Sequence, residues 1–240
     1  MIHQARFELP AIDINIEGDV LVFDKPYQCT SFDLVEKVKG YIRRGEREKG
    51  EGRKGEGRKV KVGHAGTLDP LATGVMIICI GSFTKKIEQY QAQEKEYTGT
   101  FVLGATTPSF DLEKPVDETF STEHITEEKI YQAAQSFVGE QDQVPPHFSA
   151  VKVNGKRAYL LAREGKEPEI KPKKVTISEF EITSIALPEV DFRIVCSKGT
   201  YIRSIARDFG QKLASGAHLT ALRRTRIGEF RVEGAIRVLN

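Results

Sequence analysis

The sequence predicts an α+β fold, because segments with the pattern of strands and segments with the pattern of helices follow one another at irregular intervals. A regular βαβ wind would alternate them evenly. The 240 residues are 39% hydrophobic and 29% charged, which is ordinary for a globular chain long enough to form one large domain. We therefore expect a single α+β domain over residues 1–240.

Composition narrows the classes of protein to consider. No apolar run approaches the ~20 residues of a membrane span, and the amino terminus has no apolar stretch typical of a secretory signal. These features predict a cytoplasmic protein with no membrane partner. The three cysteines form no CxxC pair and the five histidines form no HExxH motif. We therefore expect neither a disulfide framework nor a metal site.

Positive charge is concentrated in two segments, although the formal net charge is only +2. Residues 150–174 carry eight Lys and Arg against three Glu, and residues 196–240 carry nine Lys and Arg against three acidic residues. Segregated positive charge is typical of proteins that bind a polyanion such as a nucleic acid. Basic faces that are merely solvated are also common, so the charge pattern alone does not identify a partner.

The amino-terminal half predicts a strand followed by a helix. Residues 20–23 form a short apolar run that ends before Lys25 and Pro26, and proline favours an extended or turn conformation at the residue before it. A helix is expected next, with Ser31 as its cap. Its buried face should hold four apolar residues at helical spacing: Phe32, Val35, Val38 and Ile42.

Residues 43–59 form a low-complexity tract with eight basic residues, four Glu and five Gly. Glycine at this density loses much backbone entropy on ordering, and nothing in the tract is suited to burial. We expect a disordered surface loop. An auxiliary arm that contacts phosphates is the alternative.

The stretch GHAGTLDPLATG at residues 63–74 sets a single acid, Asp69, among small residues and precedes a run, residues 75–80, typical of a strand buried on both faces. Phosphate binding is one interpretation, but the GxxxxGK[ST] spacing of a P-loop is missing. A tight structural turn at Asp69-Pro70 is the second. An active-site loop with Asp69 as nucleophile or base is the third. The residues of the loop alone do not favour the active-site loop over the tight structural turn.

The remaining segments continue the mixture of strands and helices. Asn154-Gly155 favours a hairpin after residues 151–153, because Asn-Gly suits a type I′ turn. The other expected elements are helices near residues 82–90, 126–137 and 201–213, strands at 97–103 and 190–196, and strand and turn at 218–232.

GHAGTLDPLATG resembles the catalytic motif of the bacterial TruB family of tRNA pseudouridine synthases. Further blocks before and after this motif stand in the family's order: LVFDKP precedes it, and CIGSFTK, KEYTG, FSAVKVNGKRAYLLAREG, CSKGTYIRSIARDFG and GAHLTALRR come after it. The resemblance runs from about Gly18 to Leu239. It implies a long, mixed, mostly antiparallel sheet flanked by helices around a central cleft, and an RNA-gripping insertion at about residues 140–174.

The resemblance also implies an activity. Uridine 55 in the T-arm loop of tRNA would be flipped out and isomerised to pseudouridine, with Asp69 as the nucleophile and without a metal or organic cofactor. Attack on the uracil ring, attack on the sugar C1′ and action as a base all remain open for this carboxylate. Arg203 would pair with Asp69 and keep it ionised, and Tyr97 would stack on the target base.

Other residues would bind or position the RNA. His64 would help to open the RNA loop, and Leu222 would pack beside the flipped uracil. Lys25 and Pro26 would support the motif from below, and Lys85 would lie near phosphates or the motif loop. The basic segments at residues 150–174, which include Lys152, and 223–231 would hold the T-arm backbone. We expect a monomer with tRNA as its partner and no obligate protein partner.

Two departures from the family pattern bear on RNA binding. Phe148 stands where the family usually has Tyr, which removes a hydroxyl but keeps the aromatic ring. Many bacterial relatives also continue into a C-terminal PUA-type domain, whereas this sequence ends at Asn240, so we expect the catalytic domain alone to hold the T-arm.

Two alternative functions share these residues. The protein could work mainly as a tRNA-folding aid, with catalysis incidental. It could also belong with the archaeal and eukaryotic relatives that use a guide RNA, although Leu71-Ala72 after Pro70 favours the bacterial stand-alone type.

Overall fold

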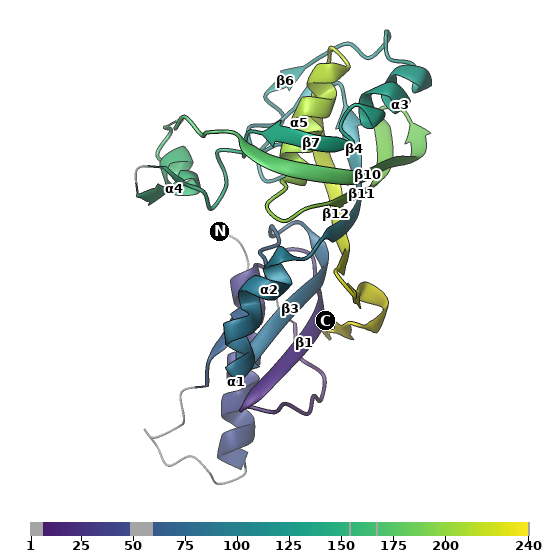
Figure 1. The fold of residues 1–240 in the computed structure, drawn as a ribbon. Coiled ribbons are helices and arrows are strands. Elements are labelled where there is room, and N and C mark those ends of the chain that lie inside the picture. Colours follow the sequence, from purple (N-terminus) through teal and green to yellow (C-terminus); the bar gives the residue numbers. More distant parts are fainter. Residues whose placement is uncertain (1–6, 49–59, 154, 167, 240) are drawn as a thin grey trace. The chain divides into compact units, whose positions relative to one another are not determined.

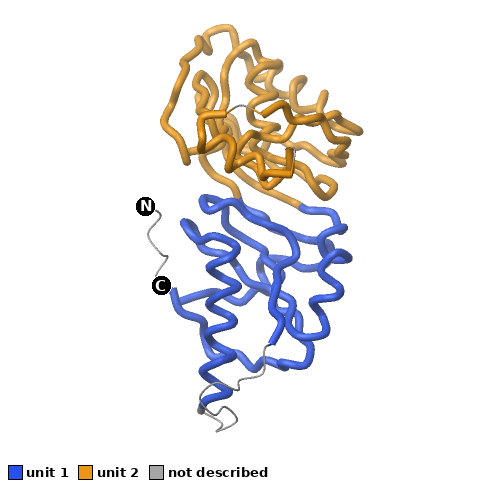
Figure 2. The backbone as a smooth tube through the Cα atoms, turned by 90° about the vertical axis from the view of Figure 1, so that its left-hand side faces the viewer, with its two compact units in different colours: residues 1–95, 223–240 blue, residues 96–222 orange. Residues whose placement is uncertain are grey.

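The computed structural model describes residues 7–48, 60–153, 155–166 and 168–239. The chain divides into two compact units, unit 1 with residues 1–95 and 223–240, and unit 2 with residues 96–222 (Figure 2). Strand β4 (Lys95–Leu103) begins in unit 1 and continues in unit 2, and strand β12 (Ala217–Ile227) begins in unit 2 and ends in unit 1. The expectation of one domain stays a prediction. Among the described residues, no helix is both long and apolar enough to cross a membrane.

Unit 1 is built on a mixed sheet with the strand order β14-β1-β3-β12. The long strand β1 (Gly18–Lys25) pairs antiparallel along its whole length with β3 (Thr73–Gly81). β3 pairs in parallel with β12, and β1 pairs in parallel with β14 (Ile236–Arg237). Two short strands complete the sheet, β2 (Val62–His64) on β3 and β13 (Phe230–Arg231) on β12.

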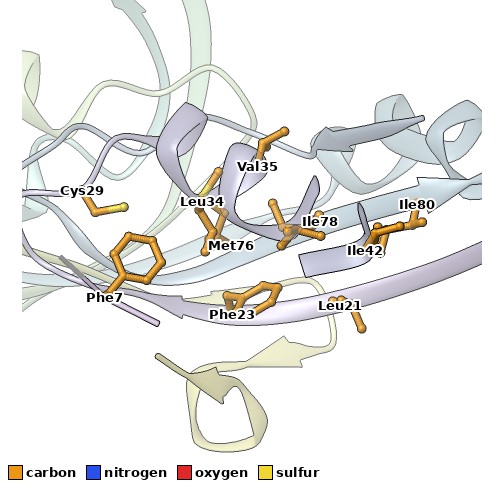
Figure 3. Packing of buried hydrophobic residues seen from close by; sticks show 11 residues of the cluster. Phe7, Leu21, Phe23, Cys29, Leu34, Val35, Ile42, Met76, Ile78 and Ile80 are labelled. Atoms are coloured by element: carbon orange, nitrogen blue, oxygen red, sulfur yellow. The ribbon is translucent and has the colours of Figure 1, made fainter. Parts of the chain in front are cut away.

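Strand β3 is buried on both faces, as its continuous apolar pattern predicts. Met76, Ile78 and Ile80 face a core built with β1 and helix α1 (Ser31–Glu48), which Figure 3 shows from close by. Val75, Ile77 and Cys79 face a second cluster. Side chains from η1 (Ser82–Lys86) and α2 (Ile87–Ala92) pack on that second cluster. The strand that follows the motif is therefore fixed from two sides.

Helix α1 differs from its prediction at both ends. Thr30, not Ser31, caps the helix, since Thr30 Oγ1 accepts from the Asp33 amide at 3.0 Å and Asp33 Oδ2 accepts from the Thr30 amide at 2.9 Å. Phe32 is 65% exposed and lies outside the core, so that prediction was wrong, whereas Val35, Val38 and Ile42 are buried. The helix also continues through residues 43–48, where a loop was expected. The rest of that tract, residues 49–59, lies outside the described residues.

Unit 2 contains the strand order β12-β4-β11-β10-β7. Its long hairpin joins β10 (Lys173–Ala186) to β11 (Glu189–Cys196), and β7 (Gly139–Gln143) pairs antiparallel with β10. Helix α3 (Glu127–Gln135) packs against β10 and against α5 (Ile202–Lys212), as can be followed in Figure 1. Aromatic rings from these elements and from the α3–β7 connection form the core: Phe101, Phe137, Phe180, Phe192 and Phe209.

Two small hairpins lie outside this sheet. β5 (Ala105–Thr106) pairs with β6 (Glu118–Thr119), and β8 (Lys152–Val153) pairs with β9 (Lys156–Arg157) just before helix α4 (Ala158–Arg163). The second pair confirms the hairpin predicted after residues 151–153, and Gly155 has a φ of +82°, whereas Asn154 lies outside the described residues. A further 3₁₀ turn, η2 (Val232–Gly234), precedes β14. Mixed strand pairing with interspersed helices confirms the α+β class.

Candidate active site

The motif at residues 63–74 forms the connection between β2 and β3 in unit 1. The Ala65 amide donates to the Ile77 carbonyl at 2.9 Å, which extends the β2–β3 ladder by one residue. The loop then closes with a β-turn in which the Ala72 amide donates to the Asp69 carbonyl at 3.1 Å. Pro70 takes the second position of this turn, where its fixed φ is favoured. The second interpretation of the motif, a tight turn at Asp69-Pro70, is therefore correct as far as the backbone is concerned.

Every carbonyl oxygen from Gly66 to Pro70 accepts a hydrogen bond. Arg224 donates to the carbonyls of Gly66 and Thr67, Ser31 to that of Leu68, and Lys25 to that of Pro70. The Asp69 carbonyl accepts from the turn amide of Ala72. The donors come from separate parts of the chain, so the loop backbone on both sides of Asp69 is held by tertiary contacts. Such saturation predicts a loop of well-defined shape.

Ser31 is bonded to both backbone groups of Leu68. Its Oγ donates to the Leu68 carbonyl at 3.0 Å and accepts from the Leu68 amide at 2.9 Å. The Ser31 side chain is free for this contact because Thr30 provides the cap of α1. Leu68 itself is buried, so the residue before Asp69 is fixed by apolar packing as well as by hydrogen bonds.

Lys25, at the end of β1, is fully buried beneath the turn. Its Nζ donates to the carbonyl oxygens of Cys29 at 2.6 Å, Pro26 at 3.0 Å and Pro70 at 3.3 Å. Burial lowers the pKa of Lys25 to about 8, although the negative charge of Asp69 acts in the opposite direction. The ammonium group of Lys25 therefore joins the Pro26 carbonyl to the motif turn. This is the way in which Lys25 and Pro26 support the motif.

Arg224 was not among the predicted site residues. It is 1% exposed, and its Nε donates to the Val75 carbonyl at 2.8 Å. Its Nη1 and Nη2 donate to the Thr67 and Gly66 carbonyls at 3.3 and 3.2 Å. The sequence contained no signal for this role, because Arg224 follows Arg223 in a strand and nothing local separates the two. Arg223, which is more exposed, forms an ion pair with Asp24 at 2.7 Å and donates to Thr73 Oγ1.

His64 is the last residue of β2 and pairs with Ile78 of β3. Burial lowers the pKa of its imidazole, a hydrogen bond to the backbone of Gly66 acts in the opposite direction, and the positive charge of Arg224 acts with burial. The imidazole is therefore neutral at pH 7. A neutral ring can stack or share a hydrogen bond with a base, but it adds no positive charge for a phosphate.

Asp69 is half-buried, between the buried Leu68 and the β-turn that starts at its own carbonyl. It is the only acid of the motif and lies in the electrostatic field of Lys25. A carboxylate on a braced loop can act as a nucleophile or as a base, since either role needs a fixed oxygen and little reorganisation. The third interpretation of the motif, an active-site loop, is compatible with this geometry.

In unit 2, Arg203 lies on α5 and is 5% exposed, so it is not part of a solvated helix face. Its Nε lies 3.6 Å from Asp111 Oδ2, and its Nη1 and Nη2 donate to the carbonyls of Ser109 and Phe148 at 3.2 and 3.0 Å. Asp111 was not predicted, since a lone Asp in a polar loop carries no local signal of burial. The expected pairing of Arg203 with Asp69 joins residues of the two units and stays a prediction.

The other predicted residues differ in exposure. Tyr97 on β4 is 8% exposed, and Leu222 on β12 and Phe148 are half-buried. Lys114 Nζ lies 5.7 Å from the centre of the Phe148 ring. Lys152 in β8 and Lys85 in η1 are exposed. Within unit 1 the structure brings Lys25, Pro26 and Asp69 together, and within unit 2 it brings Arg203 to the backbone of Phe148. Among the described residues, no cluster of His, Cys, Asp and Glu could hold a metal ion.

Comparison with known proteins gives consistent matches. Residues 53–202 match the model of the TruB family pseudouridylate synthase N-terminal domain. The chain is 56% identical over 221 residues to tRNA pseudouridine synthase B of Flavobacterium johnsoniae, which covers 92% of this chain and 93% of that protein. It is likewise 56% identical over 222 residues to the protein of the same name from Phocaeicola vulgatus, covering 92% of this chain and 91% of the relative.

Two solved structures of complexes contain a chain with the same fold. A chain of a Cbf5-Nop10-Gar1 complex is 28% identical with a TM-score of 0.64, and a chain of an H/ACA RNP bound to a substrate RNA is 26% identical with a TM-score of 0.63. Both matches cover 92% of this chain, which spans about half the length of those chains, 52% and 51%. The family match and the curated relatives together establish that this chain belongs to the TruB family of pseudouridylate synthases.

Proposed function

We propose that this protein converts uridine 55 in the T-arm loop of tRNA to pseudouridine. The observation that carries the proposal is the motif loop, in which Asp69 sits on a backbone whose neighbouring carbonyls are all bonded. Relatives that are 56% identical over more than nine tenths of their length are named tRNA pseudouridine synthase B, which supports tRNA as the substrate.

The reaction is an isomerisation that consumes no second substrate. The N1–C1′ bond of the uridine breaks, the C5–C1′ bond forms, and the hydrogen on C5 leaves as a proton while N1 gains one. No electrons are exchanged with a partner, so amino-acid side chains suffice as catalytic groups. The carboxylate of Asp69 supplies the nucleophile, which must be ionised to attack.

The remaining site residues have separate roles in this proposal. Arg203 pairs with Asp69, and Asp111 fixes the direction of the guanidinium through the 3.6 Å ion pair. Tyr97 stacks on the uracil and Leu222 packs beside it. Neutral His64 occupies the place of the flipped base in the RNA loop, because extruding a base leaves a gap in the stack that a planar uncharged ring can fill.

Exposed cations of unit 2 contact the T-arm backbone. Two exposed lysines of this unit already form ion pairs within the protein, Lys166 with Glu164 at 2.8 Å and Lys174 with Glu140 at 2.8 Å. The hairpin β8–β9, by contrast, presents Lys152, Lys156 and Arg157 to solvent. Its charge adds affinity that falls with salt, because phosphate contacts release counterions. The protein acts in the cytoplasm as a monomer, without an obligate protein partner.

The test is a position-resolved assay on an unmodified tRNA transcript. We expect pseudouridine at position 55 and at no other uridine of the T-arm, with a transcript carrying cytidine at that position as the blank. Omission of any second RNA in this assay also tests whether a guide is needed. No product, product elsewhere, or a strict need for a guide RNA would each refute the proposal. A single elution volume on size exclusion that matches 26.9 kDa checks the monomer.

A further inference from the structure

We infer that Arg224 is a positioning residue for the catalytic loop, which it ties together across the two ends of the motif. The inference rests on the proposed function, because it takes Asp69 as the catalytic carboxylate. Arg224 itself touches neither the carbonyl of Asp69 nor that of Pro70, and its effect reaches Asp69 through the backbone of Gly66 and Thr67.

The bonds of Arg224 join segments that enter and leave the loop. Gly66 and Thr67 precede Asp69, and Val75 lies in β3 after the loop has closed. The other two side chains that brace the loop act at one place each, Ser31 at Leu68 and Lys25 at Pro70. Arg224 is therefore the side chain, among these three, that sets the distance between the two ends of the loop.

This function requires arginine. A guanidinium carries five N–H donors in a rigid planar fork, and Arg224 uses Nε, Nη1 and Nη2 on three different carbonyls. A lysine has its three N–H donors on one nitrogen, so it can bond several carbonyls only where they converge on one point, as they do around Lys25 Nζ. The guanidinium is 1% exposed, and in the described part of the chain its hydrogen bonds run to carbonyls and not to a carboxylate. Carbonyl oxygens thus take the place of the water that would otherwise hydrate the guanidinium of Arg224.

The strand places Arg224 against the loop through its backbone as well. Arg224 pairs with Gly74 in the parallel β3–β12 register. A Cβ built on Gly74 would lie 2.1 Å from the Arg224 carbonyl oxygen, so the last residue of the motif must be glycine for this approach. The close backbone contact fixes the origin of the Arg224 side chain, and the side chain in turn fixes the loop.

The neighbouring arginine Arg226 supplies a matched control. It lies on the same strand and is mostly buried, but its Nη2 forms an ion pair with Glu94 at 2.9 Å and its Nη1 donates to the Gly228 carbonyl. Neither partner belongs to the motif. The same substitution at Arg224 or at Arg226 therefore removes one guanidinium from β12. Only the substitution at Arg224 also removes the loop contacts.

The experiment compares kcat and KM of Arg224→Met, Arg224→Lys and Arg226→Met on the tRNA transcript. Misplacement of a catalytic group by about 1 Å can cost about 100-fold in rate. We expect kcat of Arg224→Met to fall about 100-fold with KM within about threefold, and Arg224→Lys to recover part of the loss. Arg226→Met should keep kcat within about threefold of wild type. A kcat of Arg224→Met within about threefold of wild type overturns the inference, as does an equal loss in Arg226→Met.

Hydrogen exchange separates this inference from the proposed function. The amides of Leu68 and Ala72 are bonded within the braced loop, and they should exchange faster in Arg224→Met than in Arg226→Met. If the wild type made no pseudouridine, the proposed function would fail, and the exchange result would still decide whether Arg224 orders the loop. If Arg224→Met does not fold, Arg224→Lys decides: reduced kcat with faster loop exchange supports the inference, and wild-type values of both overturn it.

Discussion

Ser31 Oγ bonds both the carbonyl and the amide of Leu68, at 3.0 and 2.9 Å, and so fixes the residue that precedes Asp69. The contact joins the first turn of α1 to the centre of the motif. It is possible because Thr30 caps the helix in place of Ser31. The start of a helix and the geometry of the candidate catalytic loop are thereby coupled through one hydroxyl group.

We predict that Ser31→Ala loses activity and some stability. Two buried backbone groups of Leu68 lose their partner, which costs about 1–3 kcal/mol in the free energy of unfolding for each group left unsatisfied. The loosened loop should lower kcat about 10-fold with little change in KM. Urea unfolding and steady-state kinetics measure the two effects. Ser136→Ala, which removes a hydroxyl bonded to the Ala133 carbonyl at the end of α3, is the control and should leave kcat unchanged.

Lys25 should make stability depend on alkaline pH. Its pKa is lowered by burial from 10.5 to about 8, so between these values the unfolded chain binds a proton that the folded chain does not. The free energy of unfolding therefore rises with pH in this window, by about 2 kcal/mol between about pH 7 and about pH 9.5. Lys25→Met removes the titrating group. Urea unfolding at both pH values should show that the free energy of unfolding rises more with pH in the wild type than in the variant. An equal change in the two proteins would contradict the lowered pKa of Lys25.

Gly74→Ala and Gly40→Ala should change stability in opposite directions. Gly74 has a φ of +105° and no room for a Cβ beside Arg224, so alanine there must strain or displace the strand pair. We expect a loss of more than about 2 kcal/mol and a loss of activity. Gly40 lies inside α1, where an added Cβ would have no neighbour within 4 Å, and alanine should stabilise the helix by about 0.5–1 kcal/mol. Thermal unfolding of the two variants compares them directly.

Removing Asp111 should destabilise unit 2, because the buried guanidinium of Arg203 loses the carboxylate that lies 3.6 Å from its Nε. The side chains of Arg203 and Asp111 are 5% and 6% exposed, with Nε and Oδ2 3.6 Å apart. Breaking a buried ion pair at one partner typically costs about 3–5 kcal/mol. Asp111→Ala should therefore be less stable than Asp111→Asn, whose amide oxygen can still accept from the guanidinium. Chemical unfolding decides, and equal stabilities of the two variants would show that an accepting oxygen at position 111 does not stabilise Arg203.

Local patterns in the sequence predicted the elements that carry the site. The continuous apolar run of residues 75–80 correctly indicated a strand buried on two faces, and Thr126 correctly indicated the start of α3, where its hydroxyl accepts from the Lys129 amide. These features depend on the residues of one segment. The motif itself was found as a loop with one acid, and the family resemblance supplied the proposed role of Asp69.

Contacts between distant segments were not predictable in the same way. The capping rule fits Ser31 and the neighbouring Thr30 equally well, so the local pattern does not show which of the two hydroxyls caps α1. Phe32 fitted the helical period yet is 65% exposed, because the buried face of α1 is centred on Leu34 and Val38. Arg224 and Asp111 acquire their roles only when carbonyl groups or a guanidinium far along the chain come within reach, and a single sequence carries no record of that approach.

The most direct test of the central claim is the rate at which Asp69→Asn forms pseudouridine at position 55 under single-turnover conditions. Asparagine has nearly the shape of aspartate but cannot act as a carboxylate nucleophile or base. Loop hydrogen exchange like that of the wild type would show that the braced backbone is intact. We predict that the rate falls by about 1,000-fold or more while tRNA binding is retained. An Asp69→Asn variant that forms pseudouridine at the wild-type rate would contradict the account.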